Sequence, residues 1–265
     1  MSEITTAPAN NIAIQVENLK IGYHDNVVLE NLSFDIPKGE IVGILGSSGC
    51  GKSTLLKHMM GLYQPMRGDI KIFGQSIVNV SDRVYETLIH KFGVTYQNGA
   101  LLSSLNLFEN VALPLQTHTK LTSAEIRERV MQALSWVEMA DFAEYYPGEL
   151  SGGMNKRGGL ARALIMQPEI LFFDEPSAGL DPITSCELDD LILRVREQFK
   201  ATVVLVTHEL ESVLKITNSV IVLNKATKGI AASGNAVELR QNSKDQFVQA
   251  FLNRREYNPN QNHEG

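Results

Sequence analysis

The chain has 265 residues, of which 43% are hydrophobic and 20% are charged, and 30 acidic against 24 basic residues give a net charge of −6. This length allows one large domain or two small ones with a substantial core. The negative charge argues against an electrostatic grip on nucleic acid. No apolar run approaches the roughly 18–20 residues needed to span a bilayer, so composition alone predicts a soluble, acidic protein unrelated to membranes.

The N-terminus and the cysteines indicate a cytosolic protein. The first 11 residues, MSEITTAPANN, are polar and contain no apolar h-region, so we expect no secretory signal. Cys50 and Cys186 are the only cysteines. Two thiols cannot form a disulfide framework, and no Cys/His cluster has the spacing of metal ligands. We therefore expect two reduced thiols.

Short β-branched runs bounded by Gly, Asn, Asp or Pro predict strands in the first third of the chain. These strands are expected at residues 12–16, 27–36, 41–45, 69–73 and 92–96. One helix is expected among them, over residues 53–60, because Gly61 suits a C-terminal cap.

The middle of the chain, about 98–164, is dominated by helix formers. Residues 123–138 predict an amphipathic helix, with one face made by Ile126, Val130, Leu134 and Val137. Strand-like runs return at 170–173, 202–206 and 220–223, and a helix is expected at 186–198. Apolar strands spaced by helices predict an α/β core with a parallel sheet covered on both faces. Residues 254–265 are polar and predict a flexible or docking tail.

Residues 46–53, here called the phosphate loop, fit the pattern G-x-x-x-x-G-K-[ST] between a predicted strand and a predicted helix. The loop consists of Gly46, Ser47, Ser48, Gly49, Cys50, Gly51, Lys52 and Ser53, and Thr54 follows it. Its glycines let the backbone curl around a polyphosphate, and the helix N-terminus favours anions. Lys52 is expected to reach the β- and γ-phosphates of ATP, and the Ser53 hydroxyl to bind Mg²⁺.

Two further strand ends predict the rest of a hydrolytic site. Four apolar residues precede Asp174 and Glu175, and ligands of open α/β sheets lie at the carboxyl ends of strands. We expect Asp174 to hold Mg²⁺ and Glu175 to polarise the attacking water as a general base. His208 follows the strand at 202–206 and is expected to contact the γ-phosphate and that water, although a structural histidine is the alternative.

Residues 150–154, with the sequence LSGGM, form a segment here called the signature segment. Ser151 suits an N-cap, and Gly152 and Gly153 leave backbone N–H groups accessible at a positive helix end. An ordinary helix cap is the alternative. If the helical insert separates this segment from its own phosphate loop, the simplest arrangement is a symmetric dimer in which each signature segment closes over the partner's nucleotide.

Over about residues 12–240, these motifs and their order resemble the ATPase subunit of ABC transporters. The resemblance implies a P-loop NTPase core with a mostly parallel sheet, an N-terminal antiparallel β part, a helical subdomain at about 98–164, and a C-terminal helix and polar tail at 241–265. It further implies that Tyr23 stacks on adenine, that Gln97 links Mg²⁺ to the transmembrane contact, and that Asp181 contacts the dimer partner. Met154 departs from the usual glutamine of the signature.

The segments at 97–102, 107–115 and 118–119 narrow the resemblance to ATPases of the Mla phospholipid-transport group, although Gln116 and Thr117 replace an expected basic–acidic pair. That group implies membrane permease partners, a STAS-domain regulator, a periplasmic lipid-binding component, and a position on the cytoplasmic face of the bacterial inner membrane. The alternatives are the ATPase of another ABC importer or exporter, a soluble ABC-type ATPase and a non-catalytic nucleotide sensor. No long coiled-coil arm fits between Gln97 and Leu150, which disfavours a soluble ABC-type ATPase of the DNA-repair kind. The presence of both Glu175 and His208 disfavours a non-catalytic nucleotide sensor.

Overall fold

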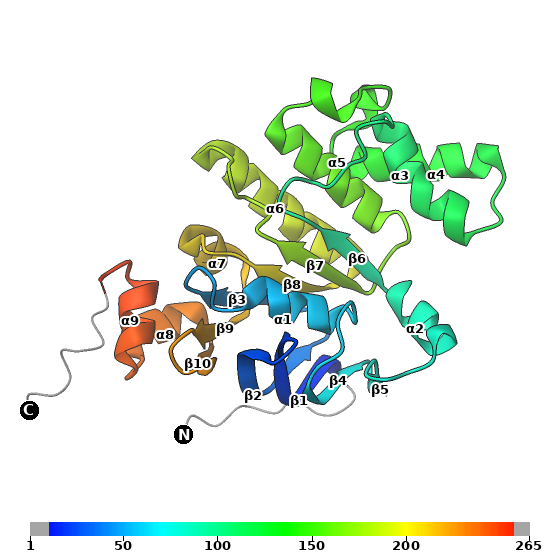
Figure 1. Ribbon diagram of the computed structural model, residues 1–265. Coiled ribbons are helices and arrows are strands. Elements are labelled where there is room, and N and C mark those ends of the chain that lie inside the picture. Colours follow the sequence, from blue (N-terminus) through cyan, green and yellow to red (C-terminus); the bar gives the residue numbers. More distant parts are fainter. Residues whose placement is uncertain (1–10, 257–265) are drawn as a thin grey trace, which may run out of the picture.

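The computed structural model describes residues 11–256, and its central sheet has six strands in the order β10-β9-β3-β8-β7-β6 (Figure 1). The parallel strands are β3 (Ile41–Gly46), β6 (Phe92–Thr95), β7 (Ile170–Asp174), β8 (Thr202–Val206) and β9 (Ser219–Asn224). At one edge β10 (Gly229–Gly234) pairs antiparallel with β9. Every residue of β3 and β8 is buried, as expected for strands covered on both faces. The predicted, mostly parallel sheet is confirmed.

A second sheet, with the order β2-β1-β4-β5, is antiparallel and is built from the N-terminal part of the chain. Its strands are β1 (Ile12–Tyr23), β2 (Asn26–Pro37), β4 (Arg67–Ile72) and β5 (Gln75–Ser76). The sequence-based prediction ended the first strand at Val16, which was wrong. The strand continues because Asn18 adopts a φ of 46° at an irregularity in the pairing with β2, and asparagine tolerates that left-handed conformation.

Helices separate the two sheets and cover the other face of the central sheet (Figure 1). Helix α1 (Lys52–Met59) buries Leu55, Leu56 and Met59 in one core with residues of both sheets. Helix α6 (Pro182–Phe199) packs in a second core together with the helical subdomain. The helices α2 (Asp82–Ile89) and α7 (Leu210–Ile216) were not predicted.

Helix α6 begins four residues earlier than predicted, at Pro182 instead of Cys186. The Asp181 side chain caps it by accepting hydrogen bonds from the backbone N–H groups of Ile183 and Thr184, at 3.0 and 3.1 Å. Proline at the first helical position needs no hydrogen-bond partner for its nitrogen. The cap and the proline together fix where the helix starts.

The helical insert contains α3 (Leu107–His118), α4 (Ser123–Trp136) and α5 (Gly152–Leu164). Two short 3₁₀ turns, η2 (Ala140–Phe142) and η3 (Pro147–Glu149), connect α4 to α5. The predicted apolar face of α4 is confirmed, because Val130, Leu134 and Val137 are buried and Ile126 is packed against the same core. These helices form the upper part of Figure 1, beyond the β6 edge of the sheet.

Two helices follow the central sheet, α8 (Ala236–Asn242) and α9 (Gln246–Leu252). A boundary at residue 240 would therefore fall inside α8. Val248 and Leu252 of α9 are buried in a small core shared with α7 and β9. The polar N-terminal segment 1–10 and residues 257–265 of the expected tail lie outside the described residues.

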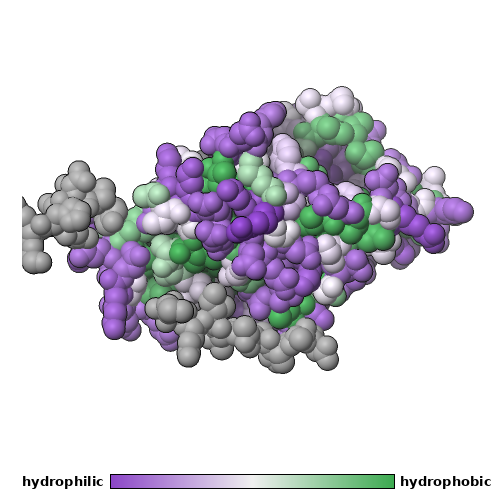
Figure 2. Space-filling view, turned by 60° about the horizontal axis from the view of Figure 1, so that its bottom comes forward, coloured by the Kyte–Doolittle hydropathy of each residue, from purple (hydrophilic) through white to green (hydrophobic). Residues whose placement is uncertain are grey.

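Within residues 11–256, no helix combines the length and the apolar character needed to cross a membrane. Hydrophilic side chains cover most of the face shown in Figure 2, and apolar residues occur there in separate patches.

Candidate functional site

The phosphate loop connects β3 to α1, and its tight course depends on glycine. Gly46 has a φ of 150°. A Cβ atom there would lie 2.6 Å from the Cys50 sulfur and 2.7 Å from the Leu223 carbonyl oxygen. Gly51, directly before α1, has a φ of 107°. Side chains at either position would be strained in this conformation, so the loop geometry requires the two glycines that the sequence motif supplies.

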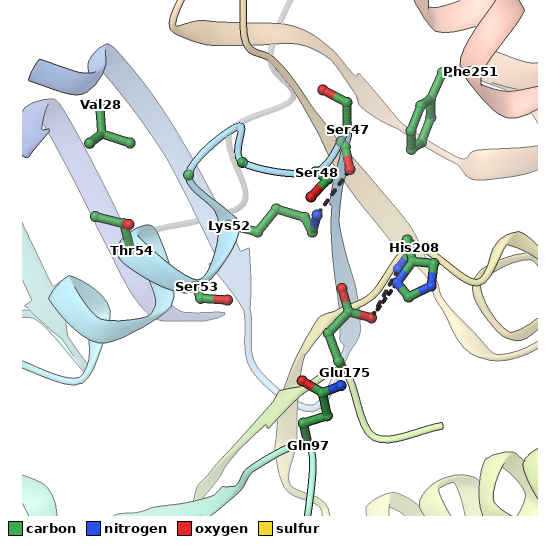
Figure 3. A pocket seen from close by; sticks show the side chains of 13 residues that line it. Val28, Ser47, Ser48, Lys52, Ser53, Thr54, Gln97, Glu175, His208 and Phe251 are labelled. Atoms are coloured by element: carbon green, nitrogen blue, oxygen red, sulfur yellow. Dashed lines mark hydrogen bonds and ion pairs between the residues drawn. The ribbon is translucent and has the colours of Figure 1, made fainter. Parts of the chain in front are cut away.

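A cavity of about 740 Å³ opens over this loop (Figure 3). Its lining includes the phosphate loop with the start of α1 and residues that follow β6, β7 and β8. The predicted site residues in that lining are Gly46, Ser47, Ser48, Gly49, Gly51, Lys52, Ser53, Thr54, Gln97, Glu175 and His208. Residues as far apart in sequence as Gly46 and His208 therefore meet at one site, because the carboxyl ends of parallel strands share one edge.

Lys52, Ser53 and Asp174 make the polar floor of the site. The Lys52 ammonium donates a hydrogen bond to the Gly46 carbonyl oxygen at 3.0 Å, and the Ser53 hydroxyl donates to a carboxylate oxygen of Asp174 at 3.0 Å. Burial raises the pKa of Asp174, while the Ser53 hydrogen bond and the nearby lysines act in the opposite direction. A hydroxyl and a carboxylate in contact are hard oxygen donors, which suit Mg²⁺.

Glu175 and His208 lie next to one another in the wall of the cavity (Figure 3). The His208 Nδ1 atom lies 2.8 Å from a carboxylate oxygen of Glu175, which also accepts the His208 backbone N–H at 3.3 Å. Glu175 has a φ of 53°, and its backbone N–H donates to the Val206 carbonyl oxygen at 2.8 Å. This left-handed conformation is uncommon for a residue other than glycine. The arrangement presents a carboxylate that can accept a proton beside an imidazole that orients it.

Three predicted residues lie next to the cavity without lining it in the described structure. The Tyr23 hydroxyl is 3.3 Å from the Thr54 hydroxyl, and 39% of the residue is exposed, so its ring borders the Thr54 end of the cavity. Asp174 reaches the site through Ser53. Cys50 is buried beneath the loop, and that burial raises the pKa of its thiol; its side chain therefore packs the loop instead of facing a ligand.

The signature segment lies elsewhere in the same chain. Ser151 caps α5, since its hydroxyl accepts the Met154 backbone N–H at 3.2 Å. Ser151 and Gly152 are exposed, and neither they nor Gly153 line the cavity in the described structure. In Figure 1, α5 belongs to the helical subdomain, whereas α1 lies between the two sheets. One chain therefore does not bring the signature segment to its own phosphate loop.

Two lining residues, Val28 and Phe251, were missed by the sequence-based analysis. Val28 lies on β2, near Thr54, and Phe251 lies on α9, beside Ser47 and His208 in Figure 3. Both come from segments remote from the motifs, and a single apolar residue carries no chemical signature. Only tertiary packing identifies them.

Comparison with known proteins identifies the family to which the chain is similar. Residues 29–178 match the ABC transporter family. A probable ribonucleotide transport ATP-binding protein, mkl, of Mycobacterium leprae is 39% identical over 94% of this chain and 71% of the relative. The intermembrane phospholipid transport system ATP-binding protein MlaF of Haemophilus influenzae is 38% identical over 92% of this chain and 91% of the relative.

Solved structures of ATP-binding cassettes share the fold. The structure of cbiO1 from Clostridium perfringens, part of the ABC transporter complex cbiONQ, aligns with a TM-score of 0.78 and 29% identity, covering 85% of this chain and 89% of that one. The dimeric bacterial ABC transporter cassette MJ0796 aligns with a TM-score of 0.75 and 30% identity, covering 84% and 98%. The family match, the relatives and the cassette fold together show that this chain belongs to the ABC transporter family and carries its ATP-binding ATPase domain.

Proposed function

We propose that the chain is the ATP-hydrolysing motor subunit of a transporter that moves phospholipid between the inner and outer membranes of a bacterium. The observation that supports hydrolysis most directly is the 2.8 Å contact between Glu175 and His208 at the wall of the cavity that holds Lys52. A nucleotide sensor would need the phosphate loop but no such acid–imidazole pair.

In the proposed mechanism, different residues bind the phosphates and the metal ion. Lys52 binds the β- and γ-phosphates, and Ser53, Gln97 and Asp174 would hold Mg²⁺ together with phosphate oxygens. Among residues 11–256, no group of three or more His, Cys, Asp and Glu side chains could hold a metal. In the proposed site, phosphate oxygens of the nucleotide would complete the ligand set. The bound ion would neutralise phosphate charge.

Glu175 accepts a proton from water as the water oxygen bonds to the γ-phosphorus and the bond to the β–γ bridging oxygen breaks, which leaves ADP and phosphate. His208 holds the Glu175 carboxylate and reaches toward the γ-phosphate. Tyr23 and Val28, which flank Thr54, would receive the adenine.

A homodimer completes the site. The signature segment is exposed and does not line its own chain's cavity, so Ser151, Gly152 and Gly153 would close over the partner's nucleotide with their backbone donors. The dimeric structure of the similar cassette MJ0796 supports this assembly. Asp181, which stands at the start of α6, would lie at the contact between the two chains.

The membrane permease would sit on the helical subdomain. A second cavity, of about 200 Å³, lies where α2, β6, α3 and α5 meet. His90 and His118 meet edge to face there with ring centroids 4.9 Å apart, and Arg162, Pro114 and Met166 complete the wall. A mixed apolar and basic groove of this kind suits a short cytoplasmic segment of a membrane protein, which would place the chain on the cytoplasmic face of the inner membrane.

The phospholipid cargo is proposed from similarity along the whole length of the chain. The alignment with the phospholipid-transport relative covers 91% of that relative, whereas those with the ribonucleotide-transport protein and a methionine import protein of Francisella tularensis cover 71% and 69%. The proposal includes a STAS-domain regulator and a periplasmic lipid-binding component as further partners.

The test is purification of the intact complex from membranes by a tag on this chain, followed by mass spectrometry of the proteins and of the extracted lipid. A permease that carries stoichiometric phospholipid is expected, with ATPase activity that a Glu175→Gln complex lacks. Recovery of an amino-acid or nucleotide importer would contradict the phospholipid cargo and leave the ATPase assignment standing.

A further inference from the structure

Lys156 is a buried cation that the hydrolytic scheme above does not use. It lies on α5, two positions after the signature segment, and only 8% of it is exposed. Its ammonium donates hydrogen bonds to the carbonyl oxygens of Pro176 and Ala178, both at 2.6 Å. Burial lowers the pKa of Lys156, and the charges of Glu209 and Glu175 oppose that effect. Burying an ammonium is costly unless its donors are used, so this residue has a specific task.

The two carbonyl groups belong to the loop that leaves the catalytic strand. Pro176 follows Glu175 directly, and the loop ends at Asp181, where α6 begins. A single side chain therefore ties the helix that starts at the signature segment to the backbone that carries Glu175. Both hydrogen bonds are short and charge-assisted, which makes this link stiffer than an ordinary contact.

The end of β6 also lies next to Lys156. Thr95 and Lys156 line one small cavity, of about 10 Å³, together with Phe173 and Pro176. The Thr95 hydroxyl is buried and has no hydrogen-bond partner among the described residues, and Thr95 is two positions before Gln97. The lysine is therefore the polar centre of a junction between three segments of the site.

Helix α5 also touches the loop after Gln97. A Cβ atom on Gly159 would lie 2.5 Å from the Gly99 carbonyl oxygen, and Arg162 donates a hydrogen bond to that oxygen at 3.3 Å. Because α5 contacts both the loop after Gln97 and the loop after Glu175, a displacement of α5 is transmitted to both.

We propose that Lys156 is a positioning residue that couples the signature helix to Glu175 of the same subunit. When the signature segment binds the partner's nucleotide, Lys156 moves the backbone of residues 176–178 together with α5. This movement positions Glu175 beside the nucleotide bound by the same subunit. Each subunit then hydrolyses ATP only after its signature segment has bound the ATP of its partner. This inference rests on the proposed hydrolytic dimer and adds the element that links its two sites.

The first test compares steady-state ATPase kinetics of the full-length chain, with its partners, in four forms. Lys156→Met keeps the stem and removes the donors, and we expect kcat to fall about 10-fold or more with KM changed less than about 3-fold. Lys156→Arg restores two donors and should recover much of kcat. Arg157→Met is the matched control, since Arg157 pairs with Glu138 and Glu187 and not with the loop, and it should retain wild-type kcat.

Thermal unfolding of each variant separates positioning from folding. If Lys156→Met fails to fold, Lys156→Gln replaces it, because the amide keeps N–H donors without the charge, and the expected loss of kcat is smaller. Wild-type kcat in a folded Lys156→Met or Lys156→Gln variant would overturn the inference. An inactive wild-type complex would instead overturn the proposed function.

The second test uses mixed dimers in which one subunit carries Glu175→Gln, so that only the other subunit hydrolyses. Lys156→Met placed in the hydrolysing subunit should reduce kcat, because that subunit's own Glu175 loses its link. The same substitution in the Glu175→Gln subunit should leave kcat within about 3-fold. Equal losses from both placements would contradict coupling within one subunit.

Discussion

At the scale of single residues, the charge of Lys52 is the strongest candidate for nucleotide affinity. Lys52→Ala is predicted to weaken ATP binding about 10- to 100-fold or more, because several charge-assisted hydrogen bonds are lost together. Isothermal titration calorimetry measures the effect. Lys71→Ala is the control, since Lys71 pairs with Glu17 in the N-terminal sheet at 2.8 Å. Unchanged affinity in Lys52→Ala would contradict the site.

Asp189 is a buried carboxyl of α6 whose ionisation affects stability. It is 5% exposed, and burial raises its pKa to about 6, although the Ser212 hydroxyl and Lys215 partly oppose this. Its ordinary pKa in an unfolded chain is about 3.9. Between these values the folded state binds more protons than the unfolded state, so the contribution of Asp189 to the free energy of unfolding falls as the pH rises.

Asp189→Asn removes the ionisable carboxyl and with it this pH-dependent contribution to the free energy of unfolding. Its free energy of unfolding relative to wild type should therefore rise by on the order of 1–3 kcal/mol between pH 4 and pH 7. Urea unfolding at the two pH values measures the difference. Asp190→Asn is the neighbouring control, because Asp190 is half exposed and pairs with Lys215. If the difference in free energy of unfolding between Asp189→Asn and wild type did not change with pH, the raised pKa of Asp189 would be refuted.

At the scale of elements, the predictable parts are those in which local sequence decides structure. The phosphate loop, β7 with Asp174 and Glu175, and the apolar face of α4 follow from glycine positions and from periodicity. The early start of α6 was missed although Asp181 and Pro182 carry the cap signal. The full length of β1 was missed because a bulge at Asn18 interrupts an otherwise continuous strand.

Residues brought in by tertiary packing were not predictable. Phe251 reaches the cavity because α9 folds back against α7, and no local pattern around it indicates a ligand. Lys156 was not singled out from the sequence, since lysines are almost never buried. Its place became visible only when the carbonyl groups of residues 176 and 178 were located.

The N-terminus of α5 offers a test that separates capping from ligand binding. Ser151 and Thr122 both cap helices through their hydroxyl groups, which accept hydrogen bonds at 3.2 and 3.3 Å. Replacing either with Ala should cost about 1 kcal/mol of stability. Only Ser151→Ala should also reduce ATP-dependent dimerisation, measured by light scattering, and equal effects of the two substitutions on dimerisation would reduce Ser151 to a structural cap.

At the scale of the whole molecule, each chain carries the phosphate-loop half of one proposed site and the signature half of another. The cavity with Lys52 and Glu175 lies at the ends of the central strands, whereas the signature segment lies in the helical subdomain (Figure 1). In the proposed homodimer, bound ATP would hold the two copies together, and its hydrolysis would release them. In the proposed transporter, this division would let ATP binding and hydrolysis move membrane partners. The described residues contain no helix that could cross a membrane.

The most direct test of this account is the Glu175→Gln variant, followed by phosphate release and by light scattering with and without ATP and Mg²⁺. We predict that turnover falls by about 10²- to 10⁴-fold, the usual contribution of a general base, while ATP binding persists and the molar mass doubles. Near-normal turnover, or a variant that stays monomeric with ATP bound, would contradict a hydrolytic dimer in which Glu175 is the base.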